Sequence, residues 1–110
     1  MTDLIDRTNL YFDTFSNKDL DGLKQMFVDD VTLRDWDINV TGIDEVLRAN
    51  LNIFKSVESI KVNPISVYRD GNIVIAEIEI LVNGDEKLLV TDILEYDGDN
   101  KIKSIRAYKG

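Results

Sequence analysis

The sequence predicts an α+β fold in which a curved antiparallel sheet wraps around three helices from the first half of the chain. Apolar residues recur at helical spacing up to about residue 55, whereas Val and Ile alternate with other residues after residue 57. Three turn signals, Asp70-Gly71-Asn72, Asn83-Gly84-Asp85 and Asp97-Gly98-Asp99, divide the second half into four strands. With 110 residues, a single domain over 1–110 is expected.

The first half contains three helical segments separated by short connections. The first spans about 3–16, where one apolar stripe comprises Leu4, Ile5, Thr8, Tyr11, Phe12 and Phe15. A short second helix begins near Leu20 and ends at Asp29-Asp30, which we expect in a solvated loop. The third runs from Ile43 to about Lys55.

The strand signals lie before and after the third helix. Alternation over 31–37 predicts a short strand, and 39–42 a loop. The four strands after Val57 should form an antiparallel meander. Pro64 interrupts the alternation of the first of these, which predicts a bulge or an edge position there.

Composition excludes several classes of function. The chain has no Cys and no His, so thiolate catalysis and the commonest metal ligands are absent. Its net charge of −8 disfavours nucleic acid and anionic membranes as partners. No leader or membrane-spanning segment is recognisable, which favours a cytoplasmic location. No cofactor is expected, and Asp35 with Asp37 offers too few ligands for a metal.

Asp92 is the main candidate for chemistry, because it interrupts an apolar strand face formed by Leu88, Val90, Leu94 and Tyr96. A carboxyl group in such a row either joins a hydrogen-bond network or stays protonated with a raised pKa. The alternative is a satisfied Asp at the sheet rim.

Asp35 and Tyr11 are the other candidates. Asp35 follows Leu33 on the inward face of the short strand, and Tyr11 lies on the stripe of the first helix. The corresponding structural interpretations are a solvated strand-end acid and a core aromatic residue.

The strand over 73–82 has two apolar faces. The even positions, Val74 to Val82, should point to the core or a cavity. The odd positions, with Leu89, Thr91 and Ile93 on the next strand, form a partly apolar outer face. This face suits a homodimer interface, although an ordinary half-exposed sheet face is the alternative.

The order of elements, together with the stretch from Asp19 to Asp35 and Gly42 before the third helix, resembles the nuclear transport factor 2-like superfamily. The similarity is to its ketosteroid isomerase and SnoaL-like branch, and it covers nearly the whole chain. It implies a cone-shaped, cystatin-like curved sheet around the helices.

The resemblance also implies site roles. In ketosteroid isomerases an Asp at the position of Asp35 is the base, while Tyr11 and a protonated Asp92 match the residues that stabilise the enolate oxygen. Trp36, Phe27, Asn50 and Lys109 depart from the family pattern. Residues expected to contact a small hydrophobic molecule are Leu33, Asn50, Val74, Ala76, Ile78, Val90, Ile105 and Ala107.

The predicted function is cofactor-free acid–base chemistry, namely isomerisation, cyclisation or dehydration of a small hydrophobic carbonyl compound. The alternative is a ligand-binding or dimerisation module without catalysis. An epoxide hydrolase of the limonene type would need an inward Arg between two Asp residues, and Arg34 alternates outward.

Overall fold

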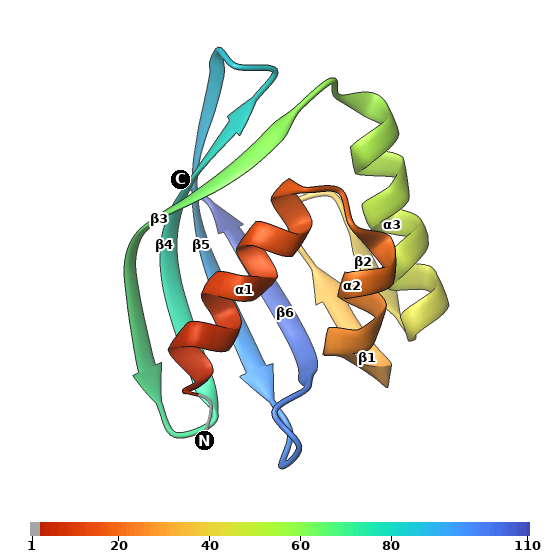
Figure 1. The fold of residues 1–110 in the computed structure, drawn as a ribbon, viewed down its shortest axis with the longest axis vertical. Coiled ribbons are helices and arrows are strands. Elements are labelled where there is room, and N and C mark those ends of the chain that lie inside the picture. Colours follow the sequence, from red (N-terminus) through yellow and green to blue (C-terminus); the bar gives the residue numbers. More distant parts are fainter. Residues whose placement is uncertain (1–2) are drawn as a thin grey trace.

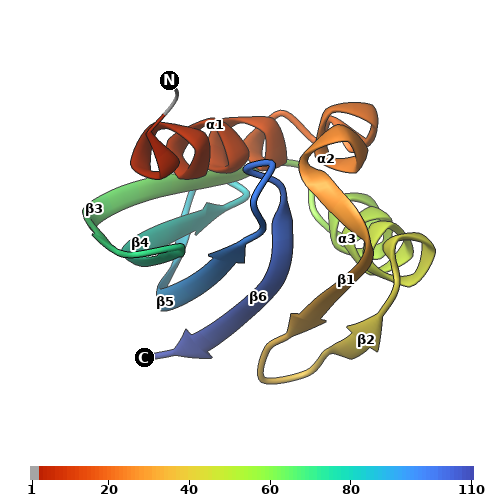
Figure 2. The same cartoon turned by 90° about the horizontal axis from the view of Figure 1, so that it is seen from below.

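The computed structural model describes residues 3–110, which form three helices and one six-stranded sheet. Figure 1 shows the three helices lying in front of the sheet, and Figure 2 shows how the sheet curves beneath α1. The elements in chain order are α1 (Leu4–Ser16), α2 (Leu20–Met26), β1 (Phe27–Arg34), β2 (Asn39–Thr41), α3 (Ile43–Ser56), β3 (Ile60–Asp70), β4 (Ile73–Val82), β5 (Glu86–Tyr96) and β6 (Ile102–Lys109).

The sheet has the strand order β2-β1-β6-β5-β4-β3. The meander from β3 to β6 is antiparallel, which confirms the prediction from the three turns. The first half of the chain then adds β1 to β6 in parallel. The sheet is therefore mixed, not wholly antiparallel, and this pairing was not foreseen because it joins segments far apart in the sequence.

Pro64 lies in β3, which is an edge strand, and the register of β3 against β4 shifts between Pro64 and Ser66. Both features suit a residue that has no N–H to donate to a neighbouring strand. The bulge and the edge position predicted from the sequence are both confirmed.

Three predictions about the first half need correction. Helix α2 ends at Met26, so Asp29 and Asp30 lie exposed on β1 and not in a loop. Strand β1 ends at Arg34, which places Asp35 and Asp37 in the following turn. Residues 39–41 form β2, where a loop was expected, because they pair with residues 32–34 of β1.

The core lies between the helices and the concave face of the sheet. The even positions of β4 face inward, and Val74, Ala76 and Ile78 are fully buried. Tyr96 and Phe12 are the largest buried side chains. No helix within residues 3–110 is long and apolar enough to cross a membrane.

Local hydrogen bonds fix the helix ends. The Asp3 side chain accepts from the Ile5 N–H, and the Asp19 side chain accepts from the Gly22 N–H, so each caps a helix. Gly42 precedes the first residue of α3 as its N-cap and has a φ of 98°, a conformation that favours glycine.

Lys18 joins the end of α1 to the end of α3. Its Nζ donates to the carbonyls of Phe54, Val57 and Glu58 at 2.9, 2.7 and 3.1 Å. These carbonyls lie at and just beyond the last turn of α3, where partners within the helix are missing.

We expect Lys18→Met to lower the unfolding free energy by about 1–3 kcal/mol, because three carbonyl groups lose their charged donor. Urea denaturation followed by circular dichroism measures this change. Lys24→Met, on the exposed surface of α2, is the matched control. Equal stability of the two variants would contradict a structural role for Lys18.

Candidate functional site

A cavity of about 250 Å³ lies between the concave face of the sheet and helices α1 and α3. Its walls are mainly apolar, with contributions from Phe12, Phe15, Ile53, Ile78, Leu88 and Val90. The volume is below the ~300–1,000 Å³ of sites for drug-sized ligands. Few polar side chains enter this space, so the position of each one is informative.

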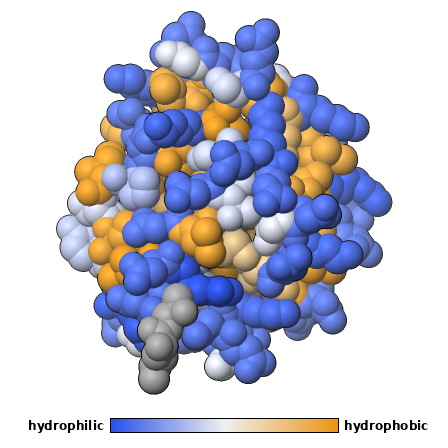
Figure 3. Space-filling view, viewed as in Figure 1, coloured by the Kyte–Doolittle hydropathy of each residue, from blue (hydrophilic) through white to orange (hydrophobic). Residues whose placement is uncertain are grey.

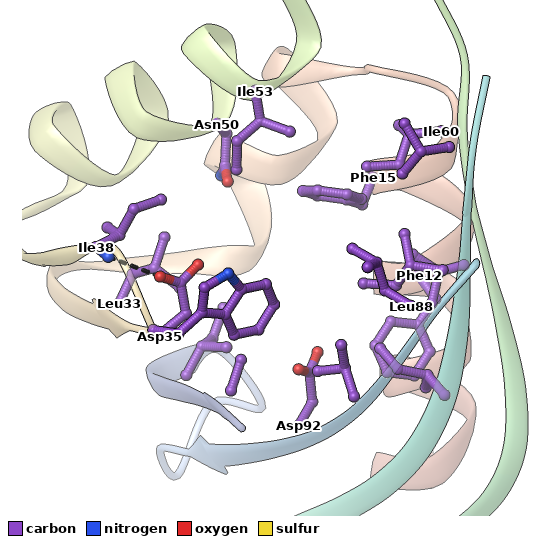
Figure 4. Close-up of a pocket in the computed structure, with 18 of the residues that line it drawn as sticks. Phe12, Phe15, Leu33, Asp35, Ile38, Asn50, Ile53, Ile60, Leu88 and Asp92 are labelled. Atoms are coloured by element: carbon purple, nitrogen blue, oxygen red, sulfur yellow. Dashed lines mark hydrogen bonds between the residues drawn. The ribbon is translucent and has the colours of Figure 1, made fainter. Parts of the chain in front are cut away.

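Asp35 reaches the cavity from the turn after β1. Its Oδ1 accepts hydrogen bonds from the N–H groups of Asp37 and Ile38 at 2.7 and 2.6 Å, and its own N–H donates to the Ile38 carbonyl. This arrangement ends the strand and fixes the carboxylate. Figure 4 shows the bond to Ile38 on one side of the carboxylate, with the second oxygen on the other side. That oxygen has no hydrogen-bond partner among residues 3–110, so it is available to a ligand.

Asp92 enters the same cavity from β5 (Figure 4). The residue is 8% exposed. Burial raises the pKa of Asp92 to about 7, and the negative charge of Asp35 contributes in the same direction. Asp92 is therefore largely protonated below neutral pH and is able to donate a hydrogen bond.

Tyr11 lines the cavity from α1 and is 6% exposed. Burial raises the pKa of its phenol, and the charges of Asp92 and Tyr96 raise it further. Its ring lies 6.2 Å from that of Phe27, which supplies packing but no hydrogen bond. The Tyr11 hydroxyl thus stays protonated and can act as a donor.

The neighbouring Tyr96 is bound within the core. Its hydroxyl lies 2.8 Å from the Thr8 hydroxyl, which itself donates to the Leu4 carbonyl at 2.8 Å. Because the single Thr8 proton is used in that bond, Tyr96 must be the donor to Thr8. Tyr96 therefore cannot donate to a ligand, and it does not line the cavity.

The structure brings Asp35, Tyr11 and Asp92 to one cavity. Among the residues expected to contact a ligand, six also line it: Leu33, Asn50, Ile78, Val90, Ile105 and Ala107. Val74 and Ala76 do not, since both are completely buried in the core. The structure therefore does not place these two side chains at the cavity. The cavity lies toward the other end of β4, at Ile78, Ile80 and Val82.

Sequence reasoning missed several lining residues. Trp36 lines the cavity from the turn that holds Asp35, and Phe12 and Phe15 line it from α1. Lys109 lies with its Nζ 5.8 Å from the centre of the Trp36 ring. The aromatic spacing in α1 was a usable signal, but nothing in the sequence indicated which way Trp36 would turn.

Metal ligation has little support in this region. Within residues 3–110 no group of three or more His, Cys, Asp or Glu side chains is placed to hold a metal ion. The lining contains no Lys or Arg, so it offers no cationic group for an anionic ligand or a phosphate.

The raised pKa of Asp92 predicts a specific pH dependence of stability. Between pH 4 and 7 the folded chain keeps a proton that the unfolded chain loses, so this residue makes stability fall as pH rises. In Asp92→Asn this contribution disappears. Relative to the wild type, the variant should gain a few kcal/mol of unfolding free energy from pH 4 to pH 7, measured by urea denaturation. A constant difference between the two proteins would contradict a raised pKa.

Comparison with known proteins identifies the family and the fold. The family model described as SnoaL-like domain matches residues 9–105. No curated protein is a significant sequence match.

Three solved structures share the fold. One is a candidate polyketide cyclase from Sinorhizobium meliloti, with a TM-score of 0.83, 21% identity and 93% of each chain covered. Another is a candidate ketosteroid isomerase from Kribbella flavida, with a TM-score of 0.81, 19% identity, and 97% of this chain and 77% of that chain covered. The third is an epoxide hydrolase from M. tuberculosis that resembles limonene epoxide hydrolase, with a TM-score of 0.84, 18% identity, and coverage of 97% and 82%.

At these identities the solved structures establish a common fold and not a common activity. The family model covers most of the chain, and the three helices and curved mixed sheet match the same architecture. The chain therefore belongs to the SnoaL-like domain family.

Proposed function

We propose that this protein is a cofactor-free acid–base enzyme that isomerises, cyclises or dehydrates a small hydrophobic carbonyl compound. The observation that carries the proposal is the pairing of two carboxyl groups in one apolar cavity, with Asp35 held by backbone N–H groups and Asp92 carrying a raised pKa. Environments that differ in this way assign a base and a hydrogen-bond donor to two residues of the same type.

In the proposed reaction, Asp35 takes a proton from a carbon next to the carbonyl. The C–H electron pair becomes the enolate double bond, and negative charge moves to the carbonyl oxygen. Tyr11 and Asp92 donate hydrogen bonds to that oxygen. For isomerisation, Asp35 returns the proton to another carbon of a conjugated dienolate. For cyclisation, the enolate carbon forms a bond to a second carbonyl carbon, and Asp35 gives the proton to the resulting alkoxide oxygen. For dehydration, Asp35 gives the proton to a hydroxyl group on the β-carbon, which leaves as water with the C–O electron pair while the enolate becomes an unsaturated ketone.

An epoxide hydrolase of the limonene type has less support. It would need an Arg directed into the site between two Asp residues, whereas Arg34 is exposed on β1 and no Arg lines the cavity. A ligand-binding module without catalysis remains the alternative function.

Hydrogen exchange tests the proposed base without knowledge of the natural substrate. We expect the wild type to accelerate exchange of the α-hydrogens of cyclohexanone in D₂O, followed by NMR. Asp35→Asn should reduce this rate about 10²-fold or more, the usual contribution of a general base. Asp30→Asn, a matched change on the exposed surface of β1, should not change it. Equal rates in wild type and Asp35→Asn would refute the assignment, and binding without exchange would favour the module.

We further propose that two copies of the chain associate through the outer face of the sheet. Tyr68, Ile75, Leu89 and Tyr108 are all at least 38% exposed on this face. By contrast, the face covered by the helices is largely hydrophilic (Figure 3). Tyr68 and Ile75 are paired, and Leu89 and Tyr108 lie farther along the same face on β5 and β6. Several large apolar side chains exposed on one face are typical of an interface.

Charge on the outer face supports a second copy as the partner. Arg34 and Arg106 are adjacent on β1 and β6, while Glu77 and Glu79 lie on β4. Among residues 3–110 none of these four makes a salt bridge. In a two-fold dimer each subunit presents the same surface to the other, so the arginines of one copy can face the glutamates of its partner.

We expect the wild type to sediment as a dimer and Ile75→Glu to sediment as a monomer, because the substitution places a charge in the apolar part of the outer face. Leu10→Glu, which changes an exposed leucine on α1, should remain dimeric. Analytical ultracentrifugation distinguishes these states. A monomeric wild type would contradict the proposal.

A further inference from the structure

Trp36 lies at the mouth of the cavity. It lines the cavity and is nevertheless 43% exposed. Among the lining residues within 3–110, only Trp36 and its neighbour Asp37 are exposed. Six other large apolar side chains in this range are exposed, but none of them lines the cavity. The cavity therefore opens to solvent at the turn after β1, and the indole lies at this opening.

Two contacts fix the position of Trp36. The turn that carries it is held by Asp35, whose Oδ1 accepts hydrogen bonds from the N–H groups of Asp37 and Ile38. The indole itself lies under Lys109, whose Nζ is 5.8 Å from the ring centre. A cation at this distance is attracted by the π electrons of the ring. The ammonium group covers one face of the indole and leaves the rest of the ring for contact with a ligand.

The sheet explains why Lys109 lies beside the mouth. Ile105 and Ala107 line the cavity from β6, and Lys109 is the next residue that points to the same side of the strand. It pairs with Val90 of β5, which also lines the cavity. Within residues 3–110 Lys109 makes no salt bridge. Its charge is therefore not neutralised by a carboxylate and can hold the indole.

The burial of the polar lining residues sets the direction in which a carbonyl compound lies. Tyr11 and Asp92 are buried, Asp35 is partly buried, and Trp36 is exposed. A carbonyl oxygen bound by Tyr11 and Asp92 is thus at the inner end of the cavity. The opposite end of the molecule points toward the mouth, and a molecule too long for the enclosed space extends along the indole.

We propose that Trp36 is a specificity-determining residue, which packs against a flat, unsaturated ring at the end of the substrate remote from its carbonyl group. Lys109 is a positioning residue, which acts through the indole. The inference rests on the proposed function, because the inner end of the substrate is the reacting carbonyl. It adds the substrate class, an uncharged carbonyl compound with a flat ring that extends beyond the cavity of about 250 Å³.

Two ketones with the same carbon skeleton test this contact by equilibrium binding, titrated by NMR. The outer ring is flat in 4-phenylcyclohexanone, whereas in 4-cyclohexylcyclohexanone it is puckered and has more apolar surface. Burial of apolar surface alone favours the second ketone, and packing against an aromatic ring favours the first. The wild type should bind 4-phenylcyclohexanone roughly threefold or more tightly, the gain from one aromatic pair. No preference in the wild type would overturn the proposal.

Variants of both residues identify the source of the preference. Trp36→Leu should lose it, whereas Trp36→Phe should retain part of it, because a phenyl ring can also stack. Lys109→Met should reduce it, since the indole loses the cation that orients it. Lys101→Met, the matched change at an exposed position between β5 and β6, should not.

Two results with these variants would contradict the assigned roles. If Trp36→Leu kept the full preference, or if Trp36→Phe bound no more selectively than Trp36→Leu, packing against the ring would not be its cause. If Lys109→Met kept the full preference, the positioning role of Lys109 would be refuted.

The fluorescence of Trp36 is an independent readout, because this residue is the only tryptophan in the chain. Saturation with 4-phenylcyclohexanone should shift the emission maximum of the wild type to shorter wavelength, because the bound ring displaces water from the exposed indole. An emission maximum that does not move at saturation would show that the ligand does not reach Trp36, and the proposal would fail.

The result is separable from that of the proposed function. If the preference depends on Trp36 but the wild type exchanges no α-hydrogens, Trp36 selects the ligand while the assigned chemistry fails. If exchange depends on Asp35 but the wild type has no preference, the chemistry stands and the role of Trp36 is refuted.

Discussion

The burial of a carboxyl group is the constraint on which the site depends. Asp92 lies on a strand face whose neighbouring inward positions, Val90 and Leu94, are apolar and buried. Little water reaches its charge, and Asp35 supplies like charge nearby. The low polarity of the walls therefore raises the pKa of Asp92 and lets an ordinary acid serve as a donor near neutral pH. The same environment keeps the Tyr11 phenol protonated.

The polar groups of the cavity contribute little to the stability of the fold, so other contacts must hold the cavity walls in place. The surrounding fold provides these contacts. Tyr96 and Thr8 join β5 to α1 by a buried hydrogen bond, and Lys18 joins the end of α1 to the end of α3. The turn at Asp35 is fixed by its own carboxylate. The walls on β5, α1 and α3 are thus held by contacts made outside the proposed reacting positions, whereas the turn is held through one oxygen of the Asp35 carboxylate.

The sequence predicted much of this architecture because much of it follows from local patterns. The helical stripes, the three turns and the interruption at Pro64 are short-range signals, and each corresponds to an observed feature. The parallel pairing of β1 with β6 is a long-range contact and has no such signal. For the same reason, the local alternation of residues did not predict that β1 begins as early as Phe27.

The sequence also predicted part of the candidate site. A carboxyl group in an apolar row singled out Asp92, and the resemblance to ketosteroid isomerases added Asp35 and Tyr11. The alternation of residues in β4 identified its inward face but did not show where along the strand the cavity lies. Because α1 and the core fill the space beside Val74 and Ala76, the cavity opens only farther along that strand. The packing of helices against strands sets the position of the cavity, and this packing cannot be read from a single sequence.

A shared fold leaves the chemistry to the few polar groups inside it. The solved structures at 18–21% identity include a candidate cyclase, a candidate isomerase and an epoxide hydrolase. In this chain the cavity lining has carboxyl, phenol and amide groups but no cationic side chain. Such a set can move a proton and stabilise charge on an oxygen by hydrogen bonds, but it gives an anionic substrate no counter-charge. The proposed chemistry therefore begins with an uncharged molecule and develops charge only during the reaction.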